Sequence, residues 1–240
     1  MNDEAAPDGF LTTLANMFVA PSRAFREVAA RPRWDAPLAL AIAVGLAFTA
    51  IWLTRADPVE FMRAQMEESG AMERIPAEMR PEVLRGQANY FSAFAWVGAL
   101  FFSPLMCAAL ALAFLAVYRF FYAAEIRYAQ SFAVVAWTFA AFTLLTTPLI
   151  LLVMSLTGEW SVDPQSAVHA NLAAVLDRET TAKPLYSLAG SVDLLTLWSI
   201  ALLSIGYAAV IGSRPTAAAW GIVVPWVLYV LGKAGLAAIF

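Results

Sequence analysis

Long stretches without any Asp, Glu, Lys or Arg constrain this chain more than any other feature of its sequence. Five such stretches occur, at residues 36–54, 86–118, 128–158, 194–213 and 215–232. About 20 helical residues cross a hydrocarbon layer about 30 Å thick, and the last stretch reaches that length by continuing past Lys233. Because backbone groups in lipid have no water to bond with, such stretches must be helical. The pattern predicts five transmembrane helices.

Composition agrees with lipid as the solvent. The chain is 61% hydrophobic and 14% charged, whereas a soluble domain has about 45–50% apolar and about 25% charged residues. We therefore expect an all-α, polytopic helical bundle with short interfacial amphipathic helices. The net charge of −3 argues against a nucleic-acid partner, which requires a basic face. The single cysteine, Cys107, builds neither a disulfide framework nor a zinc site.

The second and third stretches are longer than one crossing needs but too short for two crossings and a turn. Each is predicted to form one helix that projects beyond the membrane. Pro104, Pro148 and Pro225 lie inside predicted spans, where proline removes a backbone donor and kinks a helix.

Residues 1–35 are predicted to form a cytoplasmic amphipathic segment ahead of a transmembrane domain at 36–240. Phe10, Leu14 and Phe18 recur every four residues, and Pro21 starts a second short helix. Arginines are interleaved with these apolar positions, at Arg23, Arg26, Arg31 and Arg33. The pattern predicts a segment lying on the membrane surface. The alternative is a solvated tail whose arginines only orient the first span.

The two long hydrophilic connections, 55–85 and 159–190, are predicted to be extracytoplasmic and helical. They open with Asp57-Pro58 and Asp163-Pro164, in which the Asp can cap a helix and the Pro can occupy its first turn. Apolar residues follow at helical spacing: Val59, Met62 and Met66 in the first connection, and Val168, Leu172 and Val175 in the second. Each connection is therefore expected to form a short amphipathic helix.

Orientation follows from the positions of Lys and Arg, which are enriched in cytoplasmic loops. Seven lie on the N-terminal side of the predicted spans and seven in the opposite loops, so the count alone is a tie. Four arginines nevertheless precede the first span, and the first helix usually dominates orientation. We expect a cytoplasmic N-terminus and an extracytoplasmic C-terminus.

Asp193 and Lys233 are an acid and a base at the edges of otherwise apolar spans. Each lies about 20 residues from the turn near Arg214, so at about 1.5 Å per residue both reach a similar depth. Because charge there is costly and is usually paired, we predict an ion pair between them. Its role is either a structural clamp of the last helical hairpin or part of a relay or lipid-binding site.

No pattern for catalysis, a cofactor or a metal is present. The sequence lacks HExxH, GxSxG and Walker motifs, and its sole histidine, His169, has no partners for a metal site or a relay. We expect a protein that is not an enzyme and holds no cofactor.

Several short motifs resemble a known family. Phe18, Pro21 and Phe25 form F-x2-P-x3-F, and Pro32, Trp34 and Pro37 form P-x-W-x2-P just before the first span. Residues 193–198, DLLTLW with Trp198, then Gly206, and finally residues 229–233, YVLGK with Gly232, complete the pattern. These motifs are similar to those of the bacterial branch of the Yip1 family, and the resemblance covers nearly the whole chain.

The resemblance implies five spans and a cytoplasmic N-terminus. Eukaryotic relatives of the family reside in endoplasmic reticulum and Golgi membranes and associate with prenylated Rab GTPases and with one another. The Ala- and Arg-rich composition resembles that of bacterial proteins, which have no Rab, so that role is not carried over. The expected location is the bacterial inner membrane.

The leading functional hypothesis is an interaction or organising protein of the bilayer or of other membrane proteins. The bilayer is its expected environment, and other membrane proteins or further copies of the chain are candidate partners. The alternatives are a small lipid or solute transporter, with Asp193 and Lys233 lining a cavity, and an accessory subunit of a larger complex.

Overall fold

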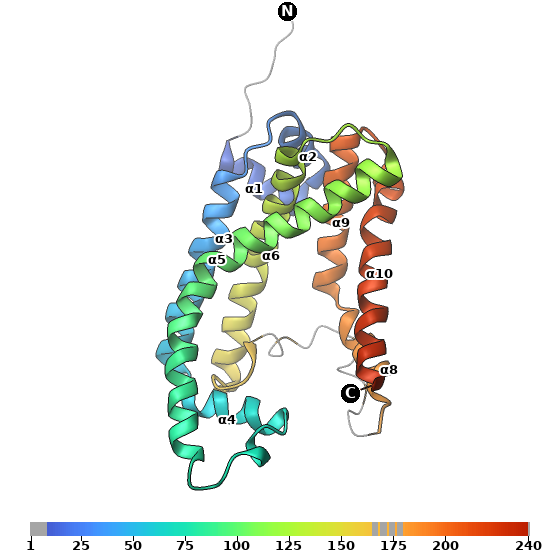
Figure 1. Cartoon of the computed structure of the whole chain (residues 1–240). Coiled ribbons are helices and arrows are strands. Elements are labelled where there is room, and N and C mark those ends of the chain that lie inside the picture. The colour runs from blue at the N-terminus through green and yellow to red at the C-terminus, as the bar shows by residue number, and fades with distance from the viewer. Residues whose placement is uncertain (1–8, 165–167, 169–171, 173–175, 177–179, 240) are drawn as a thin grey trace, which may run out of the picture. The chain divides into compact units, whose positions relative to one another are not determined.

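The computed structural model describes residues 9–164, 168, 172, 176 and 180–239. Nine α-helices and one 3-10 helix occur in this part of the chain, so that the prediction of an all-α fold is confirmed (Figure 1). The elements are α1 Phe10–Val19, α2 Pro21–Ala30, α3 Asp35–Arg55, α4 Pro58–Glu68, η1 Met72–Arg74, α5 Arg80–Tyr122, α6 Tyr128–Thr157, α8 Lys183–Ser191, α9 Leu194–Ile211 and α10 Pro215–Ile239.

Five of these helices, α3, α5, α6, α9 and α10, are long and apolar enough to cross a membrane, as predicted. The two long charge-free stretches each form one helix, α5 with 43 residues and α6 with 30. Helix α5 begins at Arg80, several residues before the charge-free stretch. Pro104, Pro148 and Pro225 lie inside α5, α6 and α10.

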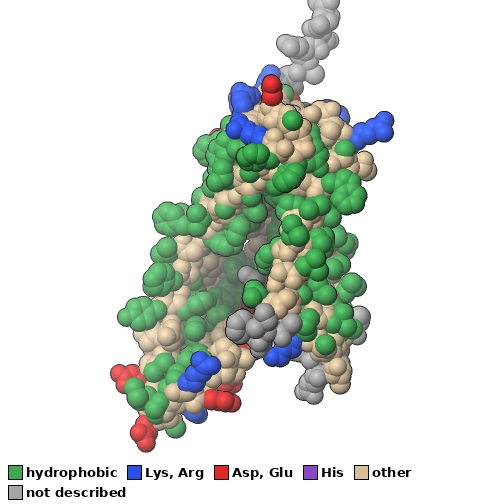
Figure 2. All heavy atoms as spheres, turned by 45° about the vertical axis from the view of Figure 1, so that its right-hand side comes forward, with side chains coloured by type: hydrophobic (Ala, Val, Ile, Leu, Met, Phe, Trp, Pro, Cys, Tyr) green, Lys and Arg blue, Asp and Glu red, His purple; other side chains and the backbone are tan. Residues whose placement is uncertain are grey.

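The surfaces of these helices are those of a protein surrounded by lipid. Only 22–28% of the residues in the most apolar window of each helix are buried inside the protein. Large side chains such as Leu105, Leu112 and Leu228 are more than 60% exposed. Figure 2 shows hydrophobic side chains along the sides of the helices and charged ones near their ends. An apolar surface of this extent is costly in water and favourable in a bilayer.

The chain divides into two compact units, and each is described by itself. The first contains Met1–Leu40, Leu105–Phe142 and His169–Phe240, and the second contains Ala41–Pro104 and Thr143–Val168. Helices α3, α5 and α6 each contribute one end to the first unit and the other end to the second.

In the second unit, an aromatic cluster holds α4 against neighbouring helices. Trp52 of α3 meets Phe61 of α4 and Phe91 of α5 edge-on, with ring centroids 5.1 Å and 5.6 Å away. Met154 of α6 belongs to the same cluster and is fully buried. Aromatic pairs in this geometry add stability beyond the area they bury. The buried face of α4 is centred on Phe61, a position that the predicted apolar stripe did not include.

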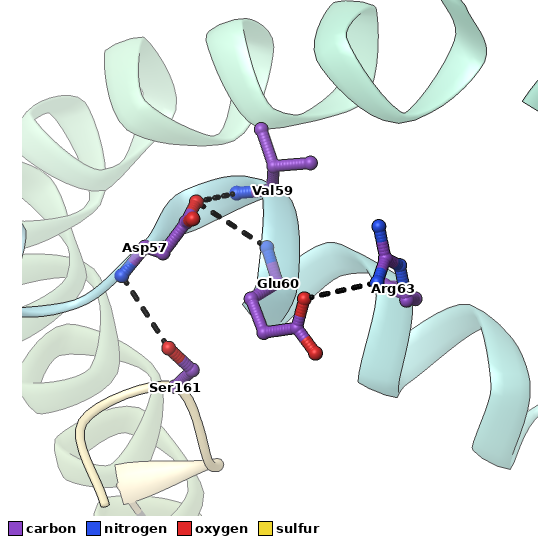
Figure 3. Close-up of polar contacts among 5 residues, drawn as sticks. All are labelled: Asp57, Val59, Glu60, Arg63 and Ser161. Carbon is purple, nitrogen blue, oxygen red and sulfur yellow. Dashed lines mark hydrogen bonds and ion pairs between the residues drawn. The ribbon is translucent and has the colours of Figure 1, made fainter. Parts of the chain in front are cut away.

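The first hydrophilic connection starts its helix as predicted (Figure 3). The Asp57 carboxylate accepts hydrogen bonds from the backbone N–H groups of Val59, at 2.8 Å, and Glu60, at 3.4 Å. The Asp57 N–H donates to Ser161 Oγ at 3.4 Å, so the same residue also contacts the second connection. These bonds satisfy N–H groups that a helix start leaves unpaired. The helix predicted after Asp163-Pro164 falls mainly on 165–167, 169–171, 173–175 and 177–179, which lie outside the described residues, as does His169.

In the first unit, the last two spans form a hairpin. Helix α9 ends at Ile211 and is capped by Gly212, whose φ of 67° is the left-handed conformation that glycine adopts without strain. Helix α10 then starts at Pro215 and packs on α9 and α8. Helix α2 packs on α9, so that the N-terminal segment joins the core of this unit.

Candidate functional site

The N-terminal segment is a pair of short helices with a fixed turn between them. Ala20 ends α1 and precedes α2, with φ −147° and ψ 58°. Pro21 occupies the first turn of α2, where its missing N–H costs nothing. The two helices pack on each other, so the segment is a folded element rather than an extended tail.

Helix α2 has one buried face and one charged face. Ala24, Phe25 and Val28 are at most 2% exposed, whereas Arg23 and Arg26 are exposed. The buried face lies in the main hydrophobic core of the first unit, together with residues of α6 and α9. The sequence predicts that the apolar face of the segment lies on the bilayer. For α2 the structure differs, because protein covers this face.

A glycine makes this contact close. A Cβ placed on Gly206 of α9 would lie 2.9 Å from Phe25 Cε1 and 2.5 Å from Val134 Cγ1 of α6, both distances shorter than real Cβ contacts. The phenyl ring of α2 therefore fits only because residue 206 has no side chain. Small residues in membrane helices commonly permit such close approach.

Aromatic pairs hold the rest of the segment. Phe18 stacks on Trp198 of α9, with ring centroids 5.6 Å apart and an interplanar angle of 22°. Trp34 meets Phe132 of α6 edge-on at 5.2 Å. Phe10 packs on Trp137 at 5.4 Å, and Trp137 donates through its Nε1 to the Arg33 carbonyl oxygen at 2.9 Å. The indole N–H thus joins α6 to the link between α2 and α3.

Most residues of the short motifs meet in this one interface. Phe18, Phe25, Trp34, Trp198 and Gly206 make the contacts described above. The prolines set the backbone around them, because Pro21 starts α2, Pro32 lies in the α2–α3 link and Pro37 is buried in the first turn of α3. Gly232 is different: a Cβ at this position would meet nothing within 4 Å.

Arginines gather at the end of the first unit where the segment lies. Besides Arg23, Arg26, Arg31 and Arg33, this end carries Arg119, Arg127 and Arg214, all exposed. Only three described acids, Glu27, Asp35 and Glu125, accompany them, so the described residues of this end have a net charge of +4. Figure 2 shows blue side chains at the end where α1 and α2 lie in Figure 1.

The core beneath the segment contains a hydroxyl cluster that the sequence analysis did not identify. Ser131 of α6 donates to the Ala111 carbonyl oxygen at 2.7 Å, and its Oγ lies 2.6 Å from the Tyr207 hydroxyl. Since Ser131 has one hydroxyl hydrogen, the Tyr207 O–H must be the donor to Ser131. Tyr207 stacks on Tyr118 at 4.4 Å, and Tyr118 donates to the Ala218 carbonyl oxygen at 2.7 Å. These hydroxyls join α5, α6, α9 and α10.

Asp193 has a structural role that differs from the predicted one. Its carboxylate accepts hydrogen bonds from the N–H groups of Leu195, at 2.8 Å, and Thr196, at 2.9 Å, and from the Thr196 hydroxyl. It is therefore the N-cap of α9. Lys233 of α10 lines a cavity beside α8, with Lys183 and Tyr186. No ion pair between Asp193 and Lys233 occurs in this described region, and the predicted pair stays a prediction.

Metal-ligating side chains do not gather at one place in the described region. No set of three or more His, Cys, Asp or Glu side chains there is arranged to hold a metal ion. Trp52 Nε1 is the one buried side-chain nitrogen or oxygen in the described part of the chain without a hydrogen-bond partner. Among the buried hydroxyls of the first unit, those of Ser131, Tyr118 and Tyr207 bond between helices, whereas those of Thr13, Thr138 and Ser204 bond to carbonyl oxygens four residues earlier in the chain.

Comparison with known proteins agrees with the motif resemblance. The Yip1 domain matches the chain over residues 15–236, which includes the second half of α1, all of α2 and all five candidate spans. No curated protein and no solved structure matches the chain.

Proposed function

The chain belongs to the Yip1 family of membrane proteins, and from that premise we propose that it organises other proteins in the bilayer without catalysing a reaction. The observation that carries this proposal is the docking of α1 and α2 on α6 and α9. Phe25 against Gly206 and Phe18 against Trp198 fix the segment, while its arginines face outward. A fixed, charged surface binds a partner with a smaller loss of conformational entropy than a mobile tail.

Charge supports a partner with acidic segments. The end of the first unit that carries α1 and α2 has a net charge of +4 in the described region. Clustered charge of one sign attracts oppositely charged partners and raises association rates, more strongly at low ionic strength. We place this end in the cytoplasm of a bacterial cell, because four arginines precede the first span and the first helix usually dominates orientation. The connections 55–85 and 159–190 would then be extracytoplasmic.

The transporter alternative has less support. It requires Asp193 and Lys233 to line a cavity, yet the Asp193 carboxylate accepts hydrogen bonds from the first N–H groups of α9. The Ser131, Tyr118 and Tyr207 hydroxyls are likewise bonded inside the core. Groups held in this way stabilise helix packing and are not free to bind a moving solute.

Site-specific photo-crosslinking in native membranes tests the proposal. A benzophenone amino acid replaces Arg26, on the exposed face of α2, and, in a control variant, Leu228, which is 64% exposed on α10. We expect position 26 to give adducts with one or a few membrane proteins and position 228 to give mainly lipid adducts. Adducts between copies of the chain would identify a homo-oligomer. Lipid adducts alone from position 26 would contradict the proposal.

A further inference from the structure

A cavity of about 260 Å³ opens beside the docked segment. It lies in the first unit, between α1, the α2–α3 link and α6. Its apolar wall includes Phe10, Val28, Pro37 and Trp137, and its charged lining comes from two arginines, Arg31 and Arg33, and two acids, Glu27 and Asp35. We call it the Arg31–Arg33 cavity. Its volume is slightly below the range of about 300–1,000 Å³ for drug-sized ligands, so it suits a smaller group.

The backbone that carries the two arginines is held in place. The Arg33 N–H donates to the Arg31 carbonyl oxygen at 2.8 Å, around Pro32. The Arg33 carbonyl oxygen in turn accepts from Trp137 Nε1 at 2.9 Å. Fixing the backbone in advance reduces the entropy that is lost when the arginines bind a ligand. Guanidinium groups are always charged and match the oxygens of a phosphate in two-point hydrogen bonds.

The charged side chains that line the cavity are not held in close ion pairs with one another. Arg31 and Glu27 form only a loose pair at 3.9 Å, and their side chains are 55% and 32% exposed. No ion pair of Arg33 or Asp35 occurs among the residues that the structure describes. Two guanidinium and two carboxylate groups thus line one cavity, and their formal charges sum to zero. A ligand with both a negative and a positive group complements this lining better than an anion does.

The position of the cavity indicates the source of such a ligand. Asp35 is the first residue of the first candidate span, Asp35–Arg55, so the cavity lies where that span begins. Residues at this point of a membrane helix meet the phospholipid headgroups. We propose that the Arg31–Arg33 cavity binds the headgroup of a phospholipid with a phosphate and a primary ammonium group, as in phosphatidylethanolamine. The arginines hold the phosphate, and Glu27 and Asp35 hold the ammonium. This proposal does not depend on a protein partner.

Native mass spectrometry of the full chain in mild detergent provides the test. Phosphatidylethanolamine, phosphatidylglycerol and phosphatidylcholine with identical acyl chains are added separately, and bound lipid is counted. We expect phosphatidylethanolamine to bind at the lowest concentration, because phosphatidylglycerol lacks the ammonium and the phosphatidylcholine ammonium cannot donate a hydrogen bond. Equal binding of the three lipids would overturn the proposal.

Three double variants, one of them a control, test which side chains bind each charge of the lipid. Arg31→Gln with Arg33→Gln removes charge-assisted hydrogen bonds to the phosphate and is expected to weaken phosphatidylethanolamine binding about tenfold or more. The control, Arg26→Gln with Arg214→Gln, removes the same charge from exposed positions that do not line the cavity, and it should leave binding unchanged. Glu27→Gln with Asp35→Asn should abolish the preference over phosphatidylglycerol. An equal loss in the control, or an unchanged preference in the acid variant, would contradict the assignment.

Soluble competitors distinguish a lipid from a free phosphate compound. Inorganic phosphate and phosphoethanolamine are added to the lipid-bound protein at the same concentration as the lipid. We expect the lipid to stay bound, because the apolar lining of the cavity near Phe10 would contact its glycerol region, a contact that neither soluble competitor can make. Displacement by inorganic phosphate would show a simple anion site and overturn the proposal.

Discussion

The phenyl ring of Phe25 on α2 occupies the space that a side chain at Gly206 on α9 would need. A Cβ on Gly206 would approach Phe25 Cε1 to 2.9 Å and Val134 Cγ1 to 2.5 Å. Phe25 is fully buried, so this contact fixes both the position of the N-terminal segment and the direction in which its arginines point. The contact also links two motif residues from opposite ends of the chain.

Replacing Gly206 with alanine should therefore loosen the segment. Overpacking a close contact typically costs about 1–3 kcal/mol of stability, which we expect as a lower thermal midpoint in detergent. Gly232→Ala is the matched control, because its Cβ would meet nothing within 4 Å and alanine favours a helix over glycine by about 0.5–1 kcal/mol. The second variant should be neutral or stabilised.

A second substitution, Val134→Ala, should partly offset the destabilisation that Gly206→Ala causes. Val134→Ala removes the atom nearest to the added methyl group, so Gly206→Ala with Val134→Ala should be less destabilised than the two single changes predict by addition. Additive losses would show that Gly206→Ala acts elsewhere than at this contact.

Asp193 should tolerate asparagine but not alanine. Asparagine also accepts hydrogen bonds from the first N–H groups of a helix, whereas loss of an N-cap costs about 0.5–2 kcal/mol. We thus expect Asp193→Asn to keep most of the thermal stability and Asp193→Ala to lose it. The predicted ion pair makes a different claim: Lys233→Ala would restore stability to Asp193→Ala, because no charge would remain unpaired. A full set of single and double variants measures both effects.

The hydroxyl cluster predicts which of two substitutions, Ser131→Ala or Tyr207→Phe, destabilises the protein more. Ser131→Ala leaves the buried Tyr207 O–H without a partner and removes the side-chain bond to the Ala111 carbonyl oxygen, which keeps its bond within helix α5, whereas Tyr207→Phe removes only a donor to Ser131. An unsatisfied buried polar group costs about 1–3 kcal/mol, and hydrogen bonds between membrane helices average about 0.6 kcal/mol. Unfolding in denaturing detergent should show Ser131→Ala to be the less stable variant. The reverse order would contradict the donor assignment.

The five spans were predictable because backbone N–H and C=O groups in lipid must hydrogen-bond with one another, so that long stretches without charged side chains form helices. The start of α4 was predictable for a local reason, since Asp57-Pro58 carries both cap and first turn. Asp193 carries the cap without the proline, directly before the apolar run that becomes α9. The predicted ion pair with Lys233 stays a prediction beside this capping role.

The docking of α2 was not predictable from periodicity. Its apolar stripe indicates only that one face is buried, and lipid and protein satisfy that requirement equally. The protein covers the face because Gly206 leaves space on α9, far along the chain. The partnership of Ser131 with Tyr207 is likewise a relation between helices, and the sequence of each helix alone does not contain it.

The proposed orientation predicts which residues are accessible from outside the cell. Cys107 is fully buried, so it gives little background with a membrane-impermeant maleimide. Arg26→Cys places a thiol on the exposed face of α2, and Ser69→Cys places one at the exposed end of α4. In intact cells we expect Ser69→Cys to be labelled at once and Arg26→Cys to react only after permeabilisation. Labelling in the opposite order would put the arginine-bearing end outside, and a partner in the cytoplasm would then have to bind the connection 55–85 instead.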